Sequence, residues 1–261
     1  MLRAMFALVA ISMAGQIAAG IHLVEVRFNG DTRLDGVDLK KCAADLKSRT
    51  YEGPQWAGSL LERVRMCLQD KGYFKAAVKA STQQLPDRNG THQFVITFNI
   101  DAGPQYRLGH ITFMNNHAIS NAKALHSLFP IKDGDILDPK AIAKGLAKLR
   151  YAYGVQGYIN FTSIPATTFD DEKKLGFLEI DVDEGKQFYV SSIDIIGADA
   201  QVLNDLALKP GQLYNVRLIE LFLRKHLPGA DLNDPNIQKR VLNERDGTVA
   251  VTFDFRSRQT E

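Results

Sequence analysis

The sequence has no excess of charge of either sign. Among its 261 residues, 32 lysines and arginines are matched by 30 aspartates and glutamates, which gives a formal net charge of +2. Like charges are not concentrated in any one stretch. Because nucleic-acid binding needs a basic face or stripe, this balance predicts no nucleic-acid partner.

Motifs that carry chemistry are also missing. The six histidines form no His-x-x-x-His pair and have no neighbouring cysteine, so the sequence predicts no metal site. It has neither a Gly-x-Ser-x-Gly segment nor a glycine-rich phosphate loop. The acidic run at 170–172 lacks the spacing of an EF-hand loop and is typical of a solvated turn. We therefore expect no catalytic residue, no cofactor and no small-molecule substrate.

Cysteine is scarce as well, since Cys42 and Cys67 are the only two. Both fall on the apolar stripes of two helices predicted in the same part of the chain. In an exported protein, an even pair on facing elements indicates a disulfide. The alternative is two reduced thiols that pack as small hydrophobic groups.

Long apolar runs are confined to the N-terminus. Arg3 precedes an apolar run at 5–13, and small residues follow at 17–20. This pattern predicts a signal peptide over residues 1–20, cleaved near Ala19 or Gly20. An uncleaved anchor is the alternative, although the run is much shorter than the roughly 20 apolar residues of a spanning helix.

The most informative feature that is present is an internal repeat. Asp101-Ala102-Gly103-Pro104-Gln105-Tyr106 is matched by Asp183-Glu184-Gly185-Lys186-Gln187-Phe188, and a Gly-Tyr pair precedes each copy, at 72–73 and at 157–158. The two copies start about 80 residues apart, and a period of that size means tandem copies of one small domain.

Hydrophobic periodicity predicts the order strand, helix, helix, strand, strand within each copy. In the first copy the strands are expected at 22–29, 74–81 and 92–100 and the helices at 37–47 and 55–70. In the second the strands are expected at 108–114, 159–164 and 175–182 and the helices at 121–128 and 139–153. The third copy diverges most, with strands at 190–196, 238–243 and 248–255, a segment at 202–208 and a helix at 215–226.

This order of elements, the Gly-Tyr pair, the Gly-x-Gln-Tyr/Phe connection and the Pro-Gly-Gln-Leu-Tyr-Asn segment at 210–215 resemble POTRA domains. POTRA domains are periplasmic modules in front of the outer-membrane barrels of the Omp85 superfamily, which assemble outer-membrane proteins. The resemblance covers about residues 22–257 and implies an α+β fold of three tandem β-α-α-β-β domains, at 21–104, 105–186 and 187–261. Each would be a three-stranded mixed sheet covered on one face by two helices.

Full-length members of the superfamily continue into a barrel, whereas this sequence stops a few residues after its last predicted strand. We therefore expect a stand-alone array. The resemblance implies a non-catalytic binding scaffold for outer-membrane protein assembly or transport, located in the periplasm and peripheral to the outer membrane. Its expected partners are an outer-membrane barrel protein or unfolded outer-membrane protein clients.

The resemblance also implies where partners bind. The second strand of each copy would be a free sheet edge to which an extended segment adds by β-augmentation. The candidate edge residues are Phe74, Lys75, Val78, Lys79, Ile159, Phe161, Thr162, Lys239 and Val241. Ordinary guarded edges are the alternative, because lysine and proline typically protect edges against pairing.

Two other hypotheses belong to different classes of protein. A cell-envelope structural or recruiter protein would keep its N-terminal segment as an uncleaved anchor. An enzyme would need a pocket with convergent titratable groups, and no such set stands out in the sequence.

Overall fold

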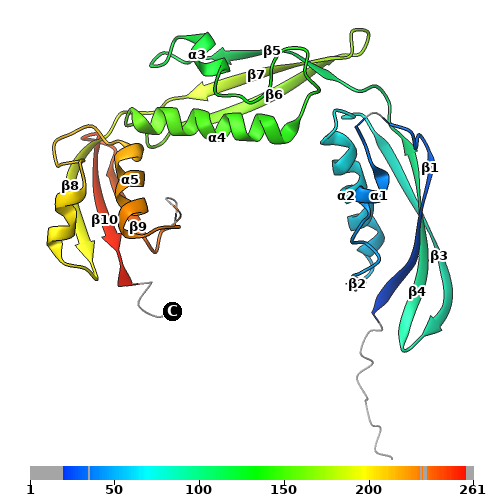
Figure 1. Cartoon of the computed structure of the whole chain (residues 1–261). Helices are drawn as coiled ribbons and strands as arrows, with labels where there is room; N and C mark the ends of the chain where they lie inside the picture. The colour runs from blue at the N-terminus through cyan, green and yellow to red at the C-terminus, as the bar shows by residue number, and fades with distance from the viewer. Residues whose placement is uncertain (1–19, 35, 230, 232–233, 257–261) are drawn as a thin grey trace, which may run out of the picture. The chain divides into compact units, whose positions relative to one another are not determined.

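A computed structural model describes residues 20–34, 36–229, 231 and 234–256 (Figure 1). Apart from Gly20, the predicted signal peptide lies outside these residues. No helix within the described ranges is long and apolar enough to cross a membrane. The chain divides into two compact units, Met1–Gln69 with Tyr73–Gly103, and Asp70–Gly72 with Pro104–Glu261.

The first unit is a four-stranded sheet with the order β2-β1-β4-β3. The central pair, β1 (Ile21–Gly30) and β4 (Thr91–Asp101), is parallel, and β3 (Ala77–Arg88) runs antiparallel to β4. The short strand β2 (Thr50–Tyr51) adds to the other side of β1 and was not predicted. Every second residue of β4 from 96 to 100 is buried, in one core with the stripe of α2 (Trp56–Gln69).

The predicted disulfide is confirmed, and it joins the two helices of this unit. Cys42, the last residue of α1 (Leu39–Cys42), bonds to Cys67 of α2 across a Cα–Cα distance of 5.9 Å. Helix α1 is shorter than the 37–47 expected from periodicity. After Cys42 the chain tightens into turns, in which the amide of Leu46 bonds to the carbonyl of Ala43.

The second unit contains two three-stranded sheets, ordered β5-β7-β6 and β8-β10-β9. In each sheet the middle strand is parallel to the first and antiparallel to the last. The strands are β5 (Arg107–Met114), β6 (Thr162–Asp170), β7 (Leu175–Asp183), β8 (Tyr189–Ile196), β9 (Gln238–Asn243) and β10 (Thr248–Asp254). The helices are α3 (Ala122–His126), α4 (Pro139–Val155), α5 (Val216–His226) and the 3-10 helix η1 (Ala200–Asp205).

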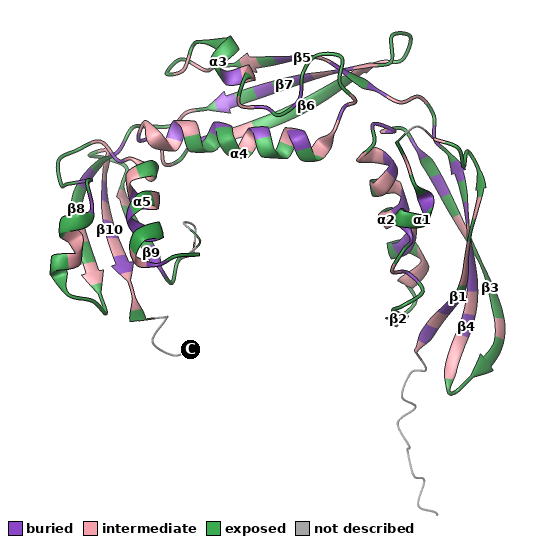
Figure 2. Ribbon diagram, viewed as in Figure 1, coloured by how far each residue is buried: buried purple, intermediate pink, exposed green. Residues whose placement is uncertain are grey.

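Helix α4 begins and packs for local reasons. The side chain of Asp138 accepts from the Lys140 amide at 2.8 Å, and Pro139 occupies the first turn, where its missing N–H costs nothing. Its buried residues recur every four positions and face the sheet, as the alternating colours along α4 indicate (Figure 2). The predicted α+β fold is thus confirmed, with the short β2 and the 3-10 helix η1 as departures from the expected pattern.

Two edge strands begin later than predicted. Strand β3 starts at Ala77 instead of residue 74, and β6 starts at Thr162 instead of residue 159. Before each strand a turn intervenes, closed by the bonds from Ala76 N to Tyr73 O at 3.2 Å and from Phe161 N to Tyr158 O at 3.4 Å. Four of the candidate edge residues therefore lie outside the strands, namely Phe74, Lys75, Ile159 and Phe161.

Phe161 in particular belongs to the core. It is 1% exposed and stacks on Tyr153 of α4, with ring centroids 4.3 Å apart. Burying an aromatic ring of this size outweighs the local preference of the segment for an extended strand.

The strands of the two hairpins also extend further than predicted, since β3 ends at Arg88 and β6 at Asp170. In the first hairpin the tight turn lies at Asn89 and Gly90, which both adopt positive φ.

Candidate functional site

Each sheet has one edge that is open along its whole length. Strands β3, β6 and β9 each pair on one side only, among the strands of the described ranges. The opposite edges are partly covered, since β2 pairs with the start of β1, and Ile136 and Leu213 form isolated bridges with the starts of β5 and β8. The segment before the long helix therefore covers one edge in every copy and leaves the other edge unpaired.

Hydrogen bonding determines which residues of β3 face the open side. The carbonyl of Ile100 accepts from Asp31 N at 2.9 Å, so Ile100 faces β1. Val78 of β3 lies opposite Ile100, and the two form a non-hydrogen-bonded pair. The N–H and C=O of Val78 therefore point away from β4, toward the open side. Alternation assigns the same direction to Ala80, Thr82 and Gln84, because the register is continuous over this stretch.

The open side of β6 is interrupted by proline. Pro165 pairs with Ile180 of β7, and because Pro165 has no N–H, this pair is of the non-hydrogen-bonded kind. The carbonyl of Lys174 accepts from Arg107 N at 2.9 Å, which independently places every second residue of β7, Ile180 included, toward β5. The outward positions of β6 thus include Ser163 and Thr167, with a missing donor between them.

In strand β9, two residues direct their backbone N–H and C=O toward the open side, with no proline between them. The Asp254 amide donates to the Ile237 carbonyl at 2.9 Å, so in this ladder Lys239 and Val241 bond to β10. The backbone groups of Arg240 and Leu242 consequently point outward.

Five of the nine candidate edge residues lie within the edge strands, and their backbone groups do not all face the open side. Val78 presents its backbone to the open edge, although its side chain is buried. Lys79, Thr162, Lys239 and Val241 lie on edge strands, but their backbone groups face the neighbouring strand. Sequence reasoning missed the outward residues of β3 and β9. Periodicity indicates on which face of the sheet a side chain lies, but it carries no information on the ladder phase, that is, on which residues direct their N–H and C=O to the neighbouring strand and which to the open side. Pro165 was the one available signal for β6.

The connection between the two sheets of the second unit explains the repeated motif. Phe188 N donates to the Gly157 carbonyl at 3.0 Å, and Tyr214 N donates to the Phe188 carbonyl at 2.8 Å. Gly157 adopts φ +83°, and a Cβ there would lie 2.8 Å from Leu213 Cδ1. Gln187 Nε2 adds a bond to the carbonyl of Gln156 at 3.1 Å. The Gly-Tyr and Gln-Phe pairs therefore join the end of one long helix to the next sheet.

A groove of about 320 Å³ lies beside this connection. Its lining residues come from α4, the segment after α4, the start of α5 and β9, namely Ala147, Arg150, Tyr151, Gly154, Tyr158, Ile159, Tyr214, Val216 and Arg240. Tyr151 donates its hydroxyl to Glu220 at 2.8 Å, and Arg224 also pairs with Glu220. Burial first, and then the bond to Glu220, raise the pKa of Tyr151.

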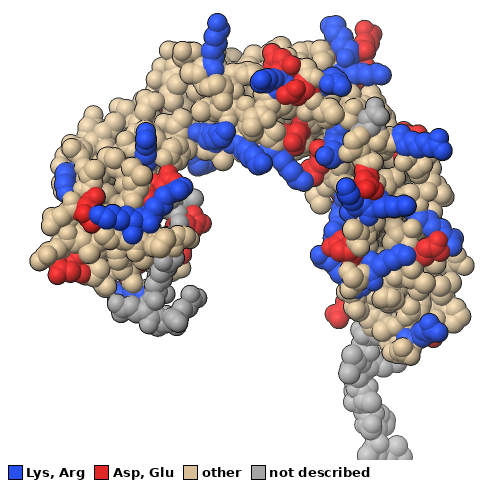
Figure 3. Space-filling view, viewed as in Figure 1, with Lys and Arg blue, Asp and Glu red and all other residues tan. Residues whose placement is uncertain are grey.

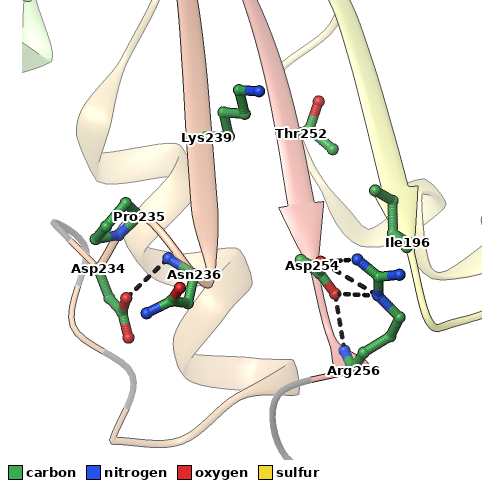
Figure 4. Close-up of a pocket in the computed structure, with 8 residues that line it drawn as sticks. All are labelled: Ile196, Asp234, Pro235, Asn236, Lys239, Thr252, Asp254 and Arg256. Carbon is green, nitrogen blue, oxygen red and sulfur yellow. Dashed lines mark hydrogen bonds and ion pairs between the residues drawn. The ribbon is translucent and has the colours of Figure 1, made fainter.

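A second hollow lies at the far end of the third sheet and is lined by Ile196, Asp234, Pro235, Asn236, Lys239, Thr252, Asp254 and Arg256 (Figure 4). Its acid and base point toward each other, with Arg256 Nη2 at 2.5 Å from Asp254 Oδ2. The hydrogen bond from the Arg256 side chain lowers the pKa of Asp254 to about 2. The charges of Asp254 and Arg256 thus neutralise each other, and Asp234, on the same hollow, accepts from the Asn236 amide at 2.8 Å.

The charges on the visible surface do not mark out a single functional face (Figure 3). Figure 3 shows basic and acidic side chains interspersed over the visible surface. Within the described ranges, no group of three or more His, Cys, Asp or Glu residues could hold a metal ion. The open edges and the groove beside β9 are therefore the candidate sites.

Comparison with known proteins identifies the repeated domain. Residues 106–185 match the POTRA family, described as a surface antigen variable number repeat. This match identifies the middle repeat as a POTRA domain. The fold of the POTRA3-5 segment of Haemophilus influenzae BamA matches it with a TM-score of 0.65 and 20% identity, over 93% of this chain and 98% of that one. The resemblance inferred from the repeat is thereby confirmed.

Two relatives of the chain are longer proteins. A Treponema pallidum protein named for outer membrane protein assembly is 25% identical over 73% of this chain, which spans 24% of that protein. The outer membrane protein assembly factor BamA of Buchnera aphidicola is 20% identical over 83% of this chain, which spans 35% of that protein. The chain thus spans only 24% and 35% of the length of these two relatives.

Proposed function

We propose that this POTRA-domain chain is a non-catalytic periplasmic scaffold for outer-membrane protein assembly or transport. It binds extended segments of clients or partners by β-augmentation at the open edges of β3 and β9. One observation carries the proposal: each edge has a stretch without proline that directs backbone donors and acceptors outward, at Val78, Ala80, Thr82 and Gln84 in β3 and at Arg240 and Leu242 in β9. Pro86 of β3 lies beyond this stretch, at the register shift between Leu85 and Arg88.

Backbone pairing suits the clients that this role implies. Ladder hydrogen bonds use groups that every non-proline residue has, so an added strand is accepted largely without regard to its side chains. Unfolded outer-membrane proteins, or an extended segment of an outer-membrane barrel partner, would supply such strands. Strand β6 is less suited, because Pro165 removes a donor from the middle of its open side.

The experiment removes one outward donor from each edge. Thr82→Pro and Leu242→Pro delete an N–H that faces the open side and leave the ladder to the neighbouring strand in place. Thr82→Val and Leu242→Val are the matched controls, since they keep the N–H and the strand preference. Loss of one backbone hydrogen bond, about 0.5–1.5 kcal/mol, corresponds to about two- to tenfold weaker capture.

Capture is measured by photo-cross-linking to a denatured outer-membrane protein, after circular dichroism has established that each variant is folded. We expect the proline variants to cross-link less than their valine controls, and the double proline variant least. Folded proline variants that capture clients as well as the controls would exclude augmentation at β3 and β9.

The proposed compartment has its own test. Mass spectrometry of the protein purified from the cell envelope should give a mature N-terminus at Ile21 or close to it. An intact Met1 terminus recovered in the membrane fraction would contradict cleavage and favour the anchored recruiter.

A further inference from the structure

The groove beside β9 carries two positive charges without an ionic partner in the described part of the chain. Arg150 projects from α4 and Arg240 from β9, and both line the groove. Glu220 contacts the lining residue Tyr151, but its carboxylate is already bound by the Tyr151 hydroxyl and by Arg224. The two guanidinium groups thus keep their full capacity for an external anion.

A buried donor at the same place is also unsatisfied. Tyr214 is 1% exposed and lines the groove, and its hydroxyl has no hydrogen-bond partner among the described residues. A buried hydroxyl without a partner costs free energy, so this wall of the groove is polar at one point. The remaining walls are apolar, from Ala147, Gly154, Ile159 and Val216, or aromatic, from Tyr151 and Tyr158. The groove therefore fits a short side chain that ends in a negative group.

The ladder phase of β9 decides what reaches this groove. Arg240 directs its backbone groups outward, and its side chain lies on the same face as the buried Gln238 and the half-buried Leu242. In an added strand, the residue opposite Arg240 places its side chain on that same face, with Cβ atoms about 5 Å apart. That side chain therefore enters the groove between Arg240 and Arg150.

We propose that the groove selects client segments with Glu or Asp at the position paired with Arg240, and that Arg150 and Arg240 bind its carboxylate. This inference rests on augmentation at β9 and adds a preference for one side chain to a contact otherwise made by backbone. Oppositely charged residues directly across a ladder attract, and a second arginine lining the same groove strengthens that attraction.

The test compares two peptides on the full-length mature chain. One is a fluorescein-labelled peptide of alternating Thr and Val with Glu at a central Thr position, and the other has Gln there. Fluorescence anisotropy should show the Glu peptide binding about three- to tenfold tighter, with the ratio falling as salt rises. Arg150→Gln should lower the ratio, because Arg240 alone then binds the carboxylate, and should leave the affinity for the Gln peptide unchanged.

Lys144→Gln is the matched control, because it removes the same charge from an exposed position of α4 that does not line the groove. It should keep the ratio of the parent. Equal binding of both peptides to the parent, or an unchanged ratio in Arg150→Gln, would overturn the carboxylate preference and leave augmentation standing. Binding of neither peptide would contradict augmentation at β9, and the preference with it.

Discussion

Two buried tyrosines of the second unit make opposite use of their hydroxyl groups. Tyr153 donates to Glu184 Oε1 at 2.9 Å, and burial together with this bond raises its pKa well above the usual range. The Tyr214 hydroxyl has no partner within the described ranges. The hydroxyl group of Tyr153 therefore stabilises the fold, whereas that of Tyr214 destabilises it.

Replacing each tyrosine by phenylalanine separates the two cases. Tyr153→Phe should lower the free energy of unfolding by about 1–2 kcal/mol, because it deletes a hydrogen bond to a carboxylate. Tyr214→Phe should leave that free energy unchanged or raise it, since only an unsatisfied group is lost. Urea denaturation of both variants measures the difference, and an equal loss in the two would contradict it.

The pair of Asp254 and Arg256 gives a residue-scale prediction for pH. The pKa of Asp254 is lowered from 3.8 to about 2, chiefly by the side-chain hydrogen bond from Arg256. A depressed carboxyl pKa contributes stability that is complete above about pH 4 and is lost as pH falls through 2. In Arg256→Gln, the carboxyl titration of Asp254 followed by NMR should move up toward 3.8. An unchanged midpoint would show that Arg256 is not the cause.

At the scale of elements, ladder phase decides how an edge strand tolerates proline. In β6 the pair of Pro165 and Ile180 fixes the phase, and the register continues without a shift to residue 170. Thr167 then points its N–H outward, whereas Thr168 points its N–H toward Phe177 of β7. Adjacent positions with the same side chain thus differ in one backbone bond.

Thr168→Pro should therefore destabilise the protein by about 1–3 kcal/mol more than Thr167→Pro, because it leaves a ladder carbonyl without its donor. Thermal or urea unfolding measures the two variants side by side. A Thr167→Pro variant that is the less stable of the two would mean that the phase deduced from Pro165 is wrong, and with it the outward positions of this edge.

At the scale of the whole molecule, the disulfide lies entirely within the first of two compact units. Cys42 and Cys67 are 25 positions apart, and closing a loop of that size adds on the order of 3 kcal/mol in the chain-entropy account. Since the second unit has its own cores, the effect should stay within the first.

The double variant Cys42→Ala with Cys67→Ala should lose about 3 kcal/mol in the first unit and leave the second unit unchanged. Hydrogen exchange followed by mass spectrometry resolves the two, because peptides from 73–103 and from 104–256 report separately. Equal loss of protection in both would indicate that the units unfold together. Thiol labelling of the parent in denaturant without reductant should find neither cysteine free.

The sequence by itself determined the features that depend on near neighbours and on repetition. Helices α2, α4 and α5 fall within about two residues of their predicted ends, because caps such as Asp138 and breakers such as Gly72 act locally. The ordered recurrence of strand, helix, helix, strand, strand, together with the Gly-Tyr pair and the Gly-x-Gln-Tyr/Phe connection, indicated the POTRA fold. The places of Cys42 and Cys67 on two apolar stripes favoured their pairing over two reduced thiols, and the structure contains the disulfide.

Only the tertiary structure decided which backbone groups the edges present. The backbone N–H and C=O of Val78 and Arg240 face outward, while those of Lys79, Lys239 and Val241 face the neighbouring strand. No local sequence pattern distinguishes the two groups. The same holds for Phe161, which joins the core against Tyr153, and for the groove that Arg150 and Arg240 share. The physical reason is that ladder phase and packing depend on partners distant in sequence, and a shift of one residue reverses every backbone group along a strand.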